Sequence, residues 1–311
     1  MSQAAILLSR IKPYLVIMRI DHWLKNLLIF PGVILALKYS EVNFEQFAMV
    51  LGTFIGVSFA ASANYSINEF LDRSYDSHHP RKKSRVAVLG KVTRKWVTVQ
   101  FIIFYSVALS IFVLIGLPSL FICILFLLNG LCYNLPPIRI KEKKYLDILS
   151  ESLNSPLRFA LGWYSLAPLS TLPSSAFIAF WFTGIFLMSL KRFVELSEFE
   201  TTAEAKAYRT SLSNYSKDQL FGLAMIGGFS ATMLFGIFIM RSYLQFILVL
   251  PFIIWIFVEF TVAAVNGKQI IHSPETTMRS PRILMILGIA LVTTCIFYIL
   301  NISTIEIVLK L

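Results

Sequence analysis

Charged residues are scarce in this sequence, and their scarcity excludes most classes of soluble protein. Only 14% of the 311 residues are Asp, Glu, Lys or Arg, whereas 57% are hydrophobic. The mean hydropathy is +0.72. Because a soluble globular chain carries about 25% charged residues, the sequence predicts an integral membrane protein.

Cysteine is also rare, and its positions do not favour a disulfide framework. Cys123, Cys132 and Cys295 all fall within apolar runs, where a free cysteine behaves as a small buried hydrophobe. The four histidines lack metalloprotease spacing, and the chain has no glycine-rich phosphate loop. No Ser-His-Asp or Cys-His set suggests a nucleophilic hydrolase.

Long apolar runs are abundant, and about 20 such residues cross the hydrocarbon core of a bilayer. Nine runs predict an all-α integral membrane bundle that forms a single domain over residues 1–311. The segment 1–25 lacks a signal-peptide cleavage pattern and is predicted to lie on the cytosolic interface. The predicted helices are 26–42, 45–69, 97–116, 118–136, 146–166, 176–192, 219–240, 244–265 and 282–302.

The distribution of positive charge predicts one orientation in the membrane. With a cytosolic N-terminus, all Lys and Arg residues except Lys38, Arg158, Arg241 and Lys310 fall in cytosolic segments or at their edges. The positive-inside rule favours this arrangement, which places the C-terminus outside. The net charge of +11 therefore does not indicate nucleic acid.

A stripe of polar side chains ends the second predicted helix. Asn64, Asn68, Asp72 and Asp76 recur every four residues and share one helical face, with Glu69 at its edge. Carboxylates that converge repel one another and need a positive partner. Oxygen ligands with amide support suit Mg²⁺, which bridges carboxylates to phosphate oxygens.

A second stripe, Asp147, Glu151, Asn154 and Arg158, follows one face of the fifth predicted helix. Arg158 lies about three turns inside it, where a cation pairs with a carboxylate or with an anionic ligand. A structural pair with Glu151 or Asn154 is as well supported as ligand contact.

The sixth predicted helix ends in the charged cluster Lys191, Arg192 and Glu195. An i, i+4 ion pair between Lys191 and Glu195 is its plain structural interpretation. Glu259, an acid within the eighth predicted helix, receives no role.

These motifs resemble those of the UbiA superfamily of intramembrane prenyltransferases. Asn68-Glu69-x-x-Asp72-x-x-x-Asp76 is similar to its first aspartate-rich motif, N-D-x-x-D-x-x-x-D, with Glu69 in place of an aspartate. The resemblance implies a nine-helix bundle with a cytosolic-side cavity that binds Mg²⁺-diphosphate. It assigns Asn68, Glu69, Asp72 and Asp76 as metal ligands, and the extra methylene makes Glu69 the least secure.

The second motif departs from the usual family pattern. Where most members carry D-x-x-x-D, this chain reads Lys191-Arg192-Phe193-Val194-Glu195. That sequence resembles the branch that transfers phosphoribose from phosphoribosyl diphosphate to polyprenyl phosphate. The resemblance assigns catalytic roles to Asp72, Asp76, Lys191, Arg192 and Glu195.

Further segments resemble the same branch, although "YNLPPIRIKEK" is closer to other branches. They are "RIDHWLKN", the run from His79 to Arg85, Lys141 with Asp147, the surroundings of Arg158 and "YRTSLSNY". The substrate-binding residues they imply are Arg19, Lys25, Asn26, Lys82, Arg85, Lys141, Asp147, Arg158, Tyr208 and Arg209.

The resemblance thus implies a Mg²⁺-dependent transferase that moves phosphoribose to a polyprenyl phosphate for cell-envelope synthesis. Its partners would be the polyprenyl lipid, a diphosphate-bearing co-substrate and membrane lipids, in a bacterial inner membrane with a cytosolic site; a homo-oligomer stays open. One alternative is an orthodox prenyltransferase that alkylates an aromatic or other acceptor. A transporter or scaffold with an intramembrane ion path is the other.

Overall fold

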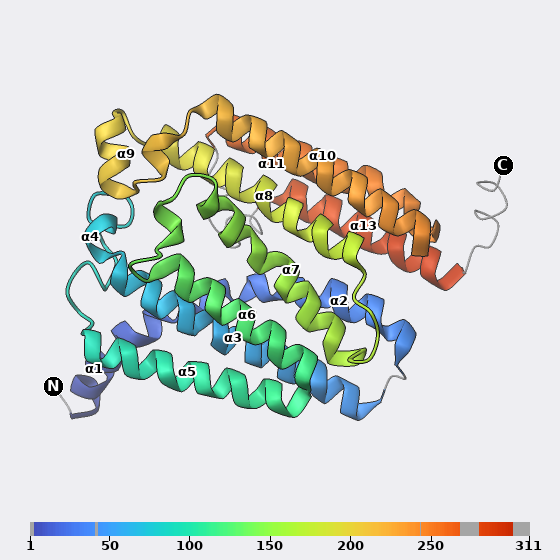
Figure 1. Ribbon diagram of the computed structural model, residues 1–311, viewed down its shortest axis with the longest axis horizontal. Helices are drawn as coiled ribbons and strands as arrows, with labels where there is room; N and C mark the ends of the chain where they lie inside the picture. The colour runs from blue at the N-terminus through green and yellow to red at the C-terminus, as the bar shows by residue number, and fades with distance from the viewer. Residues whose placement is uncertain (1–2, 41–42, 243, 268–279, 301–311) are drawn as a thin grey trace. The chain divides into compact units, whose positions relative to one another are not determined.

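All regular elements of the computed structural model are helices over the residues it describes, which are 3–40, 43–242, 244–267 and 280–300 (Figure 1). No β-strand occurs in these ranges. The all-α prediction is therefore confirmed.

The chain divides into two compact units. Unit 1 comprises Met1–Leu172 and Phe199–Tyr215, and unit 2 comprises Pro173–Glu198 and Ser216–Leu311. A single domain over 1–311 stays a prediction. The helices of unit 1 are α1 (Gln3–Ile17), η1 (Ile20–Leu28), α2 (Ile29–Ala36), η2 (Leu37–Tyr39), α3 (Phe44–Leu71), α4 (Arg73–Asp76), α5 (Arg94–Ile115), α6 (Leu117–Asn134), η3 (Ile140–Glu142), α7 (Leu146–Leu166), α9 (Thr202–Tyr208) and η4 (Leu212–Asn214). Those of unit 2 are α8 (Ser174–Ser197), α10 (Lys217–Ser242), η5 (Leu244–Val249), α11 (Leu250–Val265) and α13 (Pro281–Leu300).

Seven helices in the described part of the chain are long and apolar enough to cross a membrane, so the predicted count of nine is not confirmed. They are Ser9–Tyr39, Phe44–Leu71, Arg94–Ile115, Leu117–Asn134, Ser174–Ser197, Lys217–Arg241 and Ile247–Val265. The fifth predicted helix exists as α7, but its charged residues lower its hydropathy. The ninth corresponds to α13, of which Pro281–Ala290 counts as a shorter apolar helix; predicted residues 301–302 lie outside the described ranges.

The first predicted helix, 26–42, is α-helical only over α2, and a break lies before it in the predicted interfacial segment 1–25. Arg19 has φ 53° and ψ 55°, which is the left-handed conformation that ends a right-handed helix. The 3-10 helix η1 follows it, and α2 covers only eight residues. This break separates α1 from α2 and gives Asn26 and His22 buried positions on η1.

Two glycines let α2 and α7 approach closely within unit 1. A Cβ atom on Gly162 would lie 1.9 Å from the Ile29 backbone oxygen, and one on Gly32 would lie 2.1 Å from the Phe159 backbone oxygen. Only glycine permits such backbone contact. The same unit packs α3 beside α5 (Figure 1).

Unit 2 has its own hydrophobic core. Phe186 and Leu190 of α8 are buried against Ala224 of α10 and Ala264 of α11. Phe186 also contacts Phe257, with ring centroids 4.6 Å apart. α8, which carries the predicted second motif, is therefore held by aromatic and small side chains of α10 and α11.

Candidate active site

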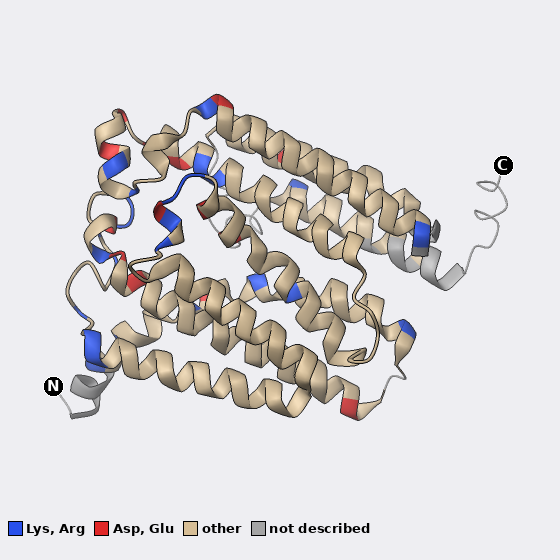
Figure 2. Ribbon diagram, in the orientation of Figure 1, with Lys and Arg blue, Asp and Glu red and all other residues tan. Residues whose placement is uncertain are grey.

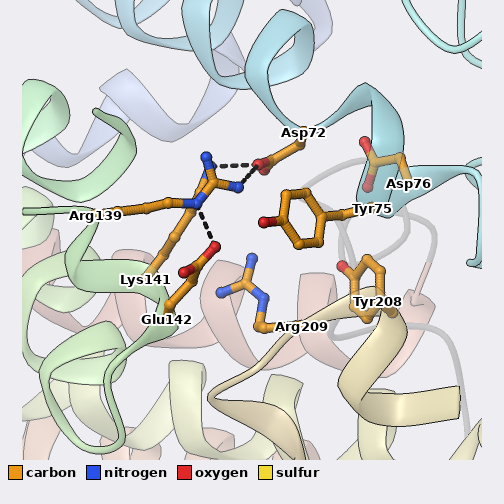
Figure 3. Close-up of a pocket in the computed structure, with 8 residues that line it drawn as sticks. All are labelled: Asp72, Tyr75, Asp76, Arg139, Lys141, Glu142, Tyr208 and Arg209. Carbon is orange, nitrogen blue, oxygen red and sulfur yellow. Dashed lines mark hydrogen bonds and ion pairs between the residues drawn. The ribbon is translucent and has the colours of Figure 1, made fainter. Parts of the chain in front are cut away.

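Charged residues of unit 1 gather where α3 and α4 meet the connection between α6 and α7, whereas most of the helices' length is uncharged (Figure 2). A pocket opens at this place, and its lining comes from three stretches of the chain (Figure 3). The lining residues are Asp72, Tyr75, Asp76, Arg139, Lys141, Glu142, Tyr208 and Arg209. The pocket therefore brings together two predicted catalytic acids and three predicted substrate-binding residues.

Asp72 lies just beyond the last residue of α3 and is 8% exposed. Its Oδ1 accepts a hydrogen bond from Lys141 Nζ and another from Arg139 Nη2 at 3.2 Å. Burial alone would raise the pKa of this carboxyl, but the charges of Lys141, Arg209 and Arg139 outweigh it and hold the pKa below its ordinary value. Asp72 is consequently an anion held among cations.

Lys141 links this pair to the end of α6. Its Nζ also donates to Asn134 Oδ1 at 2.9 Å, and the same oxygen accepts from Asn68 Nδ2 at 2.5 Å. Burial of Lys141 lowers its pKa to about 8, although Asp72 opposes the change. Asn68, a predicted metal ligand, and Lys141 thus donate to the same side-chain oxygen of Asn134.

Asp76 occupies the last position of α4 and is also buried. Arg85 Nη1 donates to its Oδ2 at 2.6 Å. Burial raises the pKa of Asp76, and the charges of Arg85 and Lys82 oppose the rise only in part. Arg85, a predicted substrate-binding residue, therefore forms a direct ion pair with an acid of the pocket lining.

Glu69 is held differently from the two aspartates. It is 4% exposed, lies on α3 outside the pocket lining, and has Arg19 Nη1 3.8 Å from its Oε2. In the part of the chain that the structure describes, no three His, Cys, Asp or Glu side chains gather as a metal cluster. The proposed ligand set accordingly presents two pocket-lining carboxylates rather than three.

The segment that contains α9 closes against the connection after α4. Lys82 Nζ donates to the Tyr208 hydroxyl and lies 4.6 Å from the centre of that ring. The His79 ring meets Tyr208 edge-on at 4.6 Å, and Phe199 stacks on Tyr208 at 5.5 Å. This aromatic cluster positions Tyr208 in the pocket wall.

Arg209 connects the pocket to a polar path along α6 and α7. Its Nη1 donates to the Tyr133 hydroxyl at 3.0 Å, and that hydroxyl donates to Glu151 Oε2 at 2.9 Å. Glu151 was singled out in the sequence only as part of the α7 stripe. Its contact with Tyr133 links that stripe by hydrogen bonds to Arg209 of the pocket lining.

The remaining predicted substrate residues of unit 1 lie outside the pocket lining. Arg158 is 5% exposed, donates from Nε to Asn26 Oδ1 at 2.8 Å and from Nη1 to the Asn154 backbone oxygen at 3.0 Å. Arg158 was interpreted either as a structural residue or as a ligand contact. Its hydrogen bonds to Asn26 and Asn154 support the structural interpretation. Arg19 Nη2 contacts His22 at 2.8 Å, and Lys25 is half-buried on η1.

Asp147 lies outside the pocket lining and binds the segment that follows α9. It is fully buried, and its Oδ1 accepts from the Tyr215 hydroxyl at 2.7 Å while its Oδ2 accepts from the Ser211 hydroxyl at 3.1 Å. These bonds fix the segment after α9 to α7. A substrate-binding role for Asp147 stays a prediction, and its observed contacts are those of a positioning residue.

In unit 2, the third predicted cluster forms an ion pair within α8. Arg192 is 1% exposed and donates from Nη1 to Glu195 Oε2 at 2.5 Å, an i, i+3 contact. The sequence suggested Lys191 as the partner of Glu195, four residues away. In the structure Arg192 and Glu195 neutralise each other's charge within α8.

Three lining residues escaped the sequence analysis: Tyr75, Arg139 and Glu142. Tyr75 lies between the two aspartates, and the Arg139 guanidinium lies 4.7 Å from the centre of its ring. Arg139 also pairs with Glu142. Arg139 lies two residues before Lys141 in "PPIRIKEK". The basic character of this connection was the feature of the sequence that could have indicated Arg139.

The fold and the pocket define a class: an integral membrane protein with ion-paired aspartates at the end of a transmembrane helix. The profile of the UbiA prenyltransferase family matches residues 27–269, and the chain belongs to this family. The family prediction is therefore confirmed. Membership supports a transferase, not a transporter or scaffold.

Curated relatives carry one enzyme name. The 4-hydroxybenzoate octaprenyltransferase of Shewanella frigidimarina is 26% identical over 151 residues, which cover 49% of this chain and 48% of that enzyme. That of Vibrio parahaemolyticus is 32% identical over 87 residues, covering 28% and 31%. The chain thus matches about half or less of these relatives' length. Their name favours the prenyltransferase alternative over the phosphoribosyl branch that the sequence motifs suggested.

Solved structures show the same fold. A UbiA homolog from Archaeoglobus fulgidus bound to DMAPP and Mg²⁺ superposes with a TM-score of 0.68 at 17% identity, covering 94% of this chain and 99% of that chain. The same homolog bound to Cd²⁺ gives 0.63 at 16% identity, covering 92% and 97%. At such identities the likeness establishes the fold alone.

Proposed function

We propose that this protein is a Mg²⁺-dependent intramembrane prenyltransferase that transfers an isoprenyl chain from its diphosphate to an aromatic acceptor of the 4-hydroxybenzoate kind. The observation that carries the proposal is the pocket in which buried Asp72 and Asp76 lie among cations. The names of the curated relatives support the choice of donor and acceptor.

The charge in and around the pocket suits a diphosphate. Arg139, Lys141 and Arg209 line it, and Lys82 and Arg85 contact two of its walls. Charge-assisted hydrogen bonds from Arg and Lys are the strongest contacts a protein offers to phosphate oxygens. These cations now neutralise the aspartates, so they are already positioned for an anionic ligand.

The donor set also fits Mg²⁺. This ion is usually bound through one or two carboxylates together with substrate phosphates, and keeps several waters. Asp72 and Asp76 supply two carboxylates, and Asn68 supplies an amide oxygen. These three residues lie on successive turns from the end of α3 to the end of α4. When bound, the ion would neutralise charge on the departing diphosphate.

The chain's own residues account for the remaining work. Arg139 and Lys141 stabilise negative charge that develops on the leaving oxygen, and they need no reorganisation because Asp72 already holds them. The ring of Tyr75, beneath the Arg139 guanidinium, and the ring of Tyr208 form an aromatic wall. Electron-rich ring faces stabilise an allylic cation.

The charge distribution supports a cytosolic position for the pocket. The pocket lies at the end of unit 1 that carries the basic connections after α3 and α6, and the positive-inside rule puts such connections in the cytosol. A water-soluble thiol reagent should therefore label Ser84→Cys only when it reaches the cytosolic side. Labelling from outside would reverse the orientation.

Phosphoribosyl transfer remains a second candidate because of one observation. Lys191 stands where the second motif usually has its first aspartate, with Arg192 directly after it, and a cationic helix end suits direct phosphate contact. In this alternative the polyprenyl phosphate would be the acceptor. Its own phosphate oxygen would attack the ribose, so no general base is needed.

One parallel assay separates the two candidates. Purified protein with Mg²⁺ receives labelled isoprenyl diphosphate plus 4-hydroxybenzoate, and separately labelled phosphoribosyl diphosphate plus polyprenyl phosphate. We expect a prenylated aromatic product in the first mixture, abolished by a chelator. Label that enters the lipid phase only in the second mixture would reject prenyl transfer in favour of phosphoribosyl transfer.

A further inference from the structure

Five exposed cations lie on α1 and around the start of α5, on the same unit as the pocket but separate from its lining. We call them the basic surface: Arg10, Lys12, Lys91, Arg94 and Lys95. Neither of the segments that carry them, residues 9–17 and 86–100, contains an Asp or Glu. The basic surface is thus a local excess of positive charge.

Packing within unit 1 brings the two parts of this surface together. Ile17 at the end of α1 is buried against Ala87, Val92 and Val97. The Tyr14 hydroxyl accepts a hydrogen bond from the Thr93 backbone N–H at 3.1 Å, just before α5 begins. α1 therefore lies beside the start of α5 (Figure 1), where a transmembrane helix leaves the hydrocarbon.

The basic surface differs from the pocket in how its charge is balanced. In the pocket, Lys141, Arg139 and Arg85 each pair with an aspartate. Among the described residues, none of the five cations of the basic surface forms an ion pair with an acid. Within the described part of the chain, their charge is therefore left for an anionic partner to balance.

Apolar side chains surround these cations and are equally exposed. Trp96 is 56% exposed, Leu15 50% and Leu89 53%. Lys95 Nζ lies 6.0 Å from the Trp96 ring centre. Tryptophan, leucine and basic residues on one surface are typical of protein that lies at the headgroup level of a bilayer.

We propose that the basic surface binds the phosphodiester head groups of anionic phospholipids. The five cations supply complementary charge, and Trp96, Leu15 and Leu89 contact the upper acyl chains. The positive end of the α5 dipole points to the same place and adds to the attraction. This binding is independent of the prenyl transfer proposed for the Asp72 pocket.

The test measures lipid selectivity rather than catalysis. Purified protein in a neutral detergent is titrated with phosphatidylglycerol or with phosphatidylcholine, and native mass spectrometry counts the bound lipid. We expect a preference for phosphatidylglycerol that falls on the order of tenfold in the variant R94Q/K95Q, because each basic residue near the surface contributes to this attraction. Unchanged preference in that variant would overturn the proposal.

The chain offers a control of equal charge. K206Q/K217Q removes two exposed lysines elsewhere and should keep the full preference. An equal fall in this control would mean that net charge, not the basic surface, selects the lipid. If R94Q/K95Q does not fold, R10Q/K12Q tests the α1 side of the same surface.

A final arm separates lipid from small anions. Inorganic phosphate in molar excess should leave phosphatidylglycerol binding nearly unchanged, since it lacks acyl chains to contact Trp96 and Leu89. Complete displacement by phosphate would identify a small-anion site and reject a lipid surface.

Discussion

Lys141 Nζ donates a hydrogen bond to Asp72 Oδ1 across 69 residues of sequence, and both side chains are buried. Removal of one partner from a buried ion pair leaves an uncompensated charge, which costs about 3–5 kcal/mol. The pair therefore joins the end of α3 to the connection before α7. It also places next to each other an acid suited to Mg²⁺ and a cation suited to a diphosphate.

Asp72→Asn should abolish most transfer activity without loss of the fold. The amide keeps the size of the side chain but removes the charge that holds Lys141 and Arg139 and that would bind the metal. We expect product formation to fall at least about 100-fold, as measured with labelled isoprenyl diphosphate. Helix content by circular dichroism should stay unchanged.

The matched control for that variant is Asp218→Asn, which removes an exposed acid in the first turn of α10. Its activity should equal that of the unmodified protein. Retained activity in Asp72→Asn would show that the aspartate has a structural role only.

Arg85 should affect binding of the diphosphate more than the fold. Arg85→Gln removes the ion pair to Asp76 and one cation near the pocket, whereas Arg85→Lys retains a charge without the planar guanidinium. We expect the KM for the prenyl diphosphate to rise roughly tenfold or more in Arg85→Gln and less in Arg85→Lys. Steady-state kinetics at saturating acceptor measures both.

Lys83→Gln removes an exposed cation two positions away and provides the comparison. Its KM should not change. If Lys83→Gln and Arg85→Gln raise KM equally, general loop charge rather than the Arg85–Asp76 pair binds the substrate.

Lys141 predicts how stability depends on pH in protein kept free of divalent metal. Burial, opposed by Asp72, lowers the pKa of Lys141 from 10.5 to about 8. Between these two values the unfolded chain binds more protons at this residue than the folded protein does. The free energy of unfolding should therefore rise with pH across this window, by at most about 3 kcal/mol, in thermal unfolding experiments.

Lys141→Arg tests the assignment, because a guanidinium remains charged over the whole window. The rise of stability with pH should be absent or much smaller in this variant. The same rise in Lys141→Arg would assign the titration to another group.

Gly162→Ala should destabilise unit 1 at the contact between α2 and α7. The new methyl group would lie 1.9 Å from the Ile29 backbone oxygen, and a backbone atom cannot move away as a flexible side chain can. We expect a loss of about 3 kcal/mol or more, seen as a lower unfolding temperature. Gly222→Ala, which meets no atom within 4 Å in α10, should be neutral or gain about 1 kcal/mol.

The positions of most helices could be predicted from the sequence because apolar runs are local signals. α7 begins and ends where the sequence predicts, and α3 and α5 differ from prediction by a few residues. The first span is the exception. The predicted helix 26–42 is α-helical only over Ile29–Ala36, and nothing in the preceding segment 1–25 reveals the left-handed Arg19 that separates α1 from η1.

Part of the site could also be predicted, because Asp72 and Asp76 share one helical face. Their cationic partners could not be matched to them in the same way. Arg139 and Lys141 contact Asp72 across 67 and 69 residues of sequence, respectively. Several basic connections were available, and only packing of the α6–α7 connection against α3 selects among them.

The sequence by itself determined that the chain is a helical membrane protein with an acidic stripe at the end of its second long helix. Hydropathy and helical periodicity carry this information, since both depend on neighbouring residues. The tertiary structure alone decided that Asp72 pairs with Lys141 and Asp76 with Arg85, while Glu69 lies apart beside Arg19. Such pairing depends on how separate helices pack, and burial strengthens each pair by the exclusion of water.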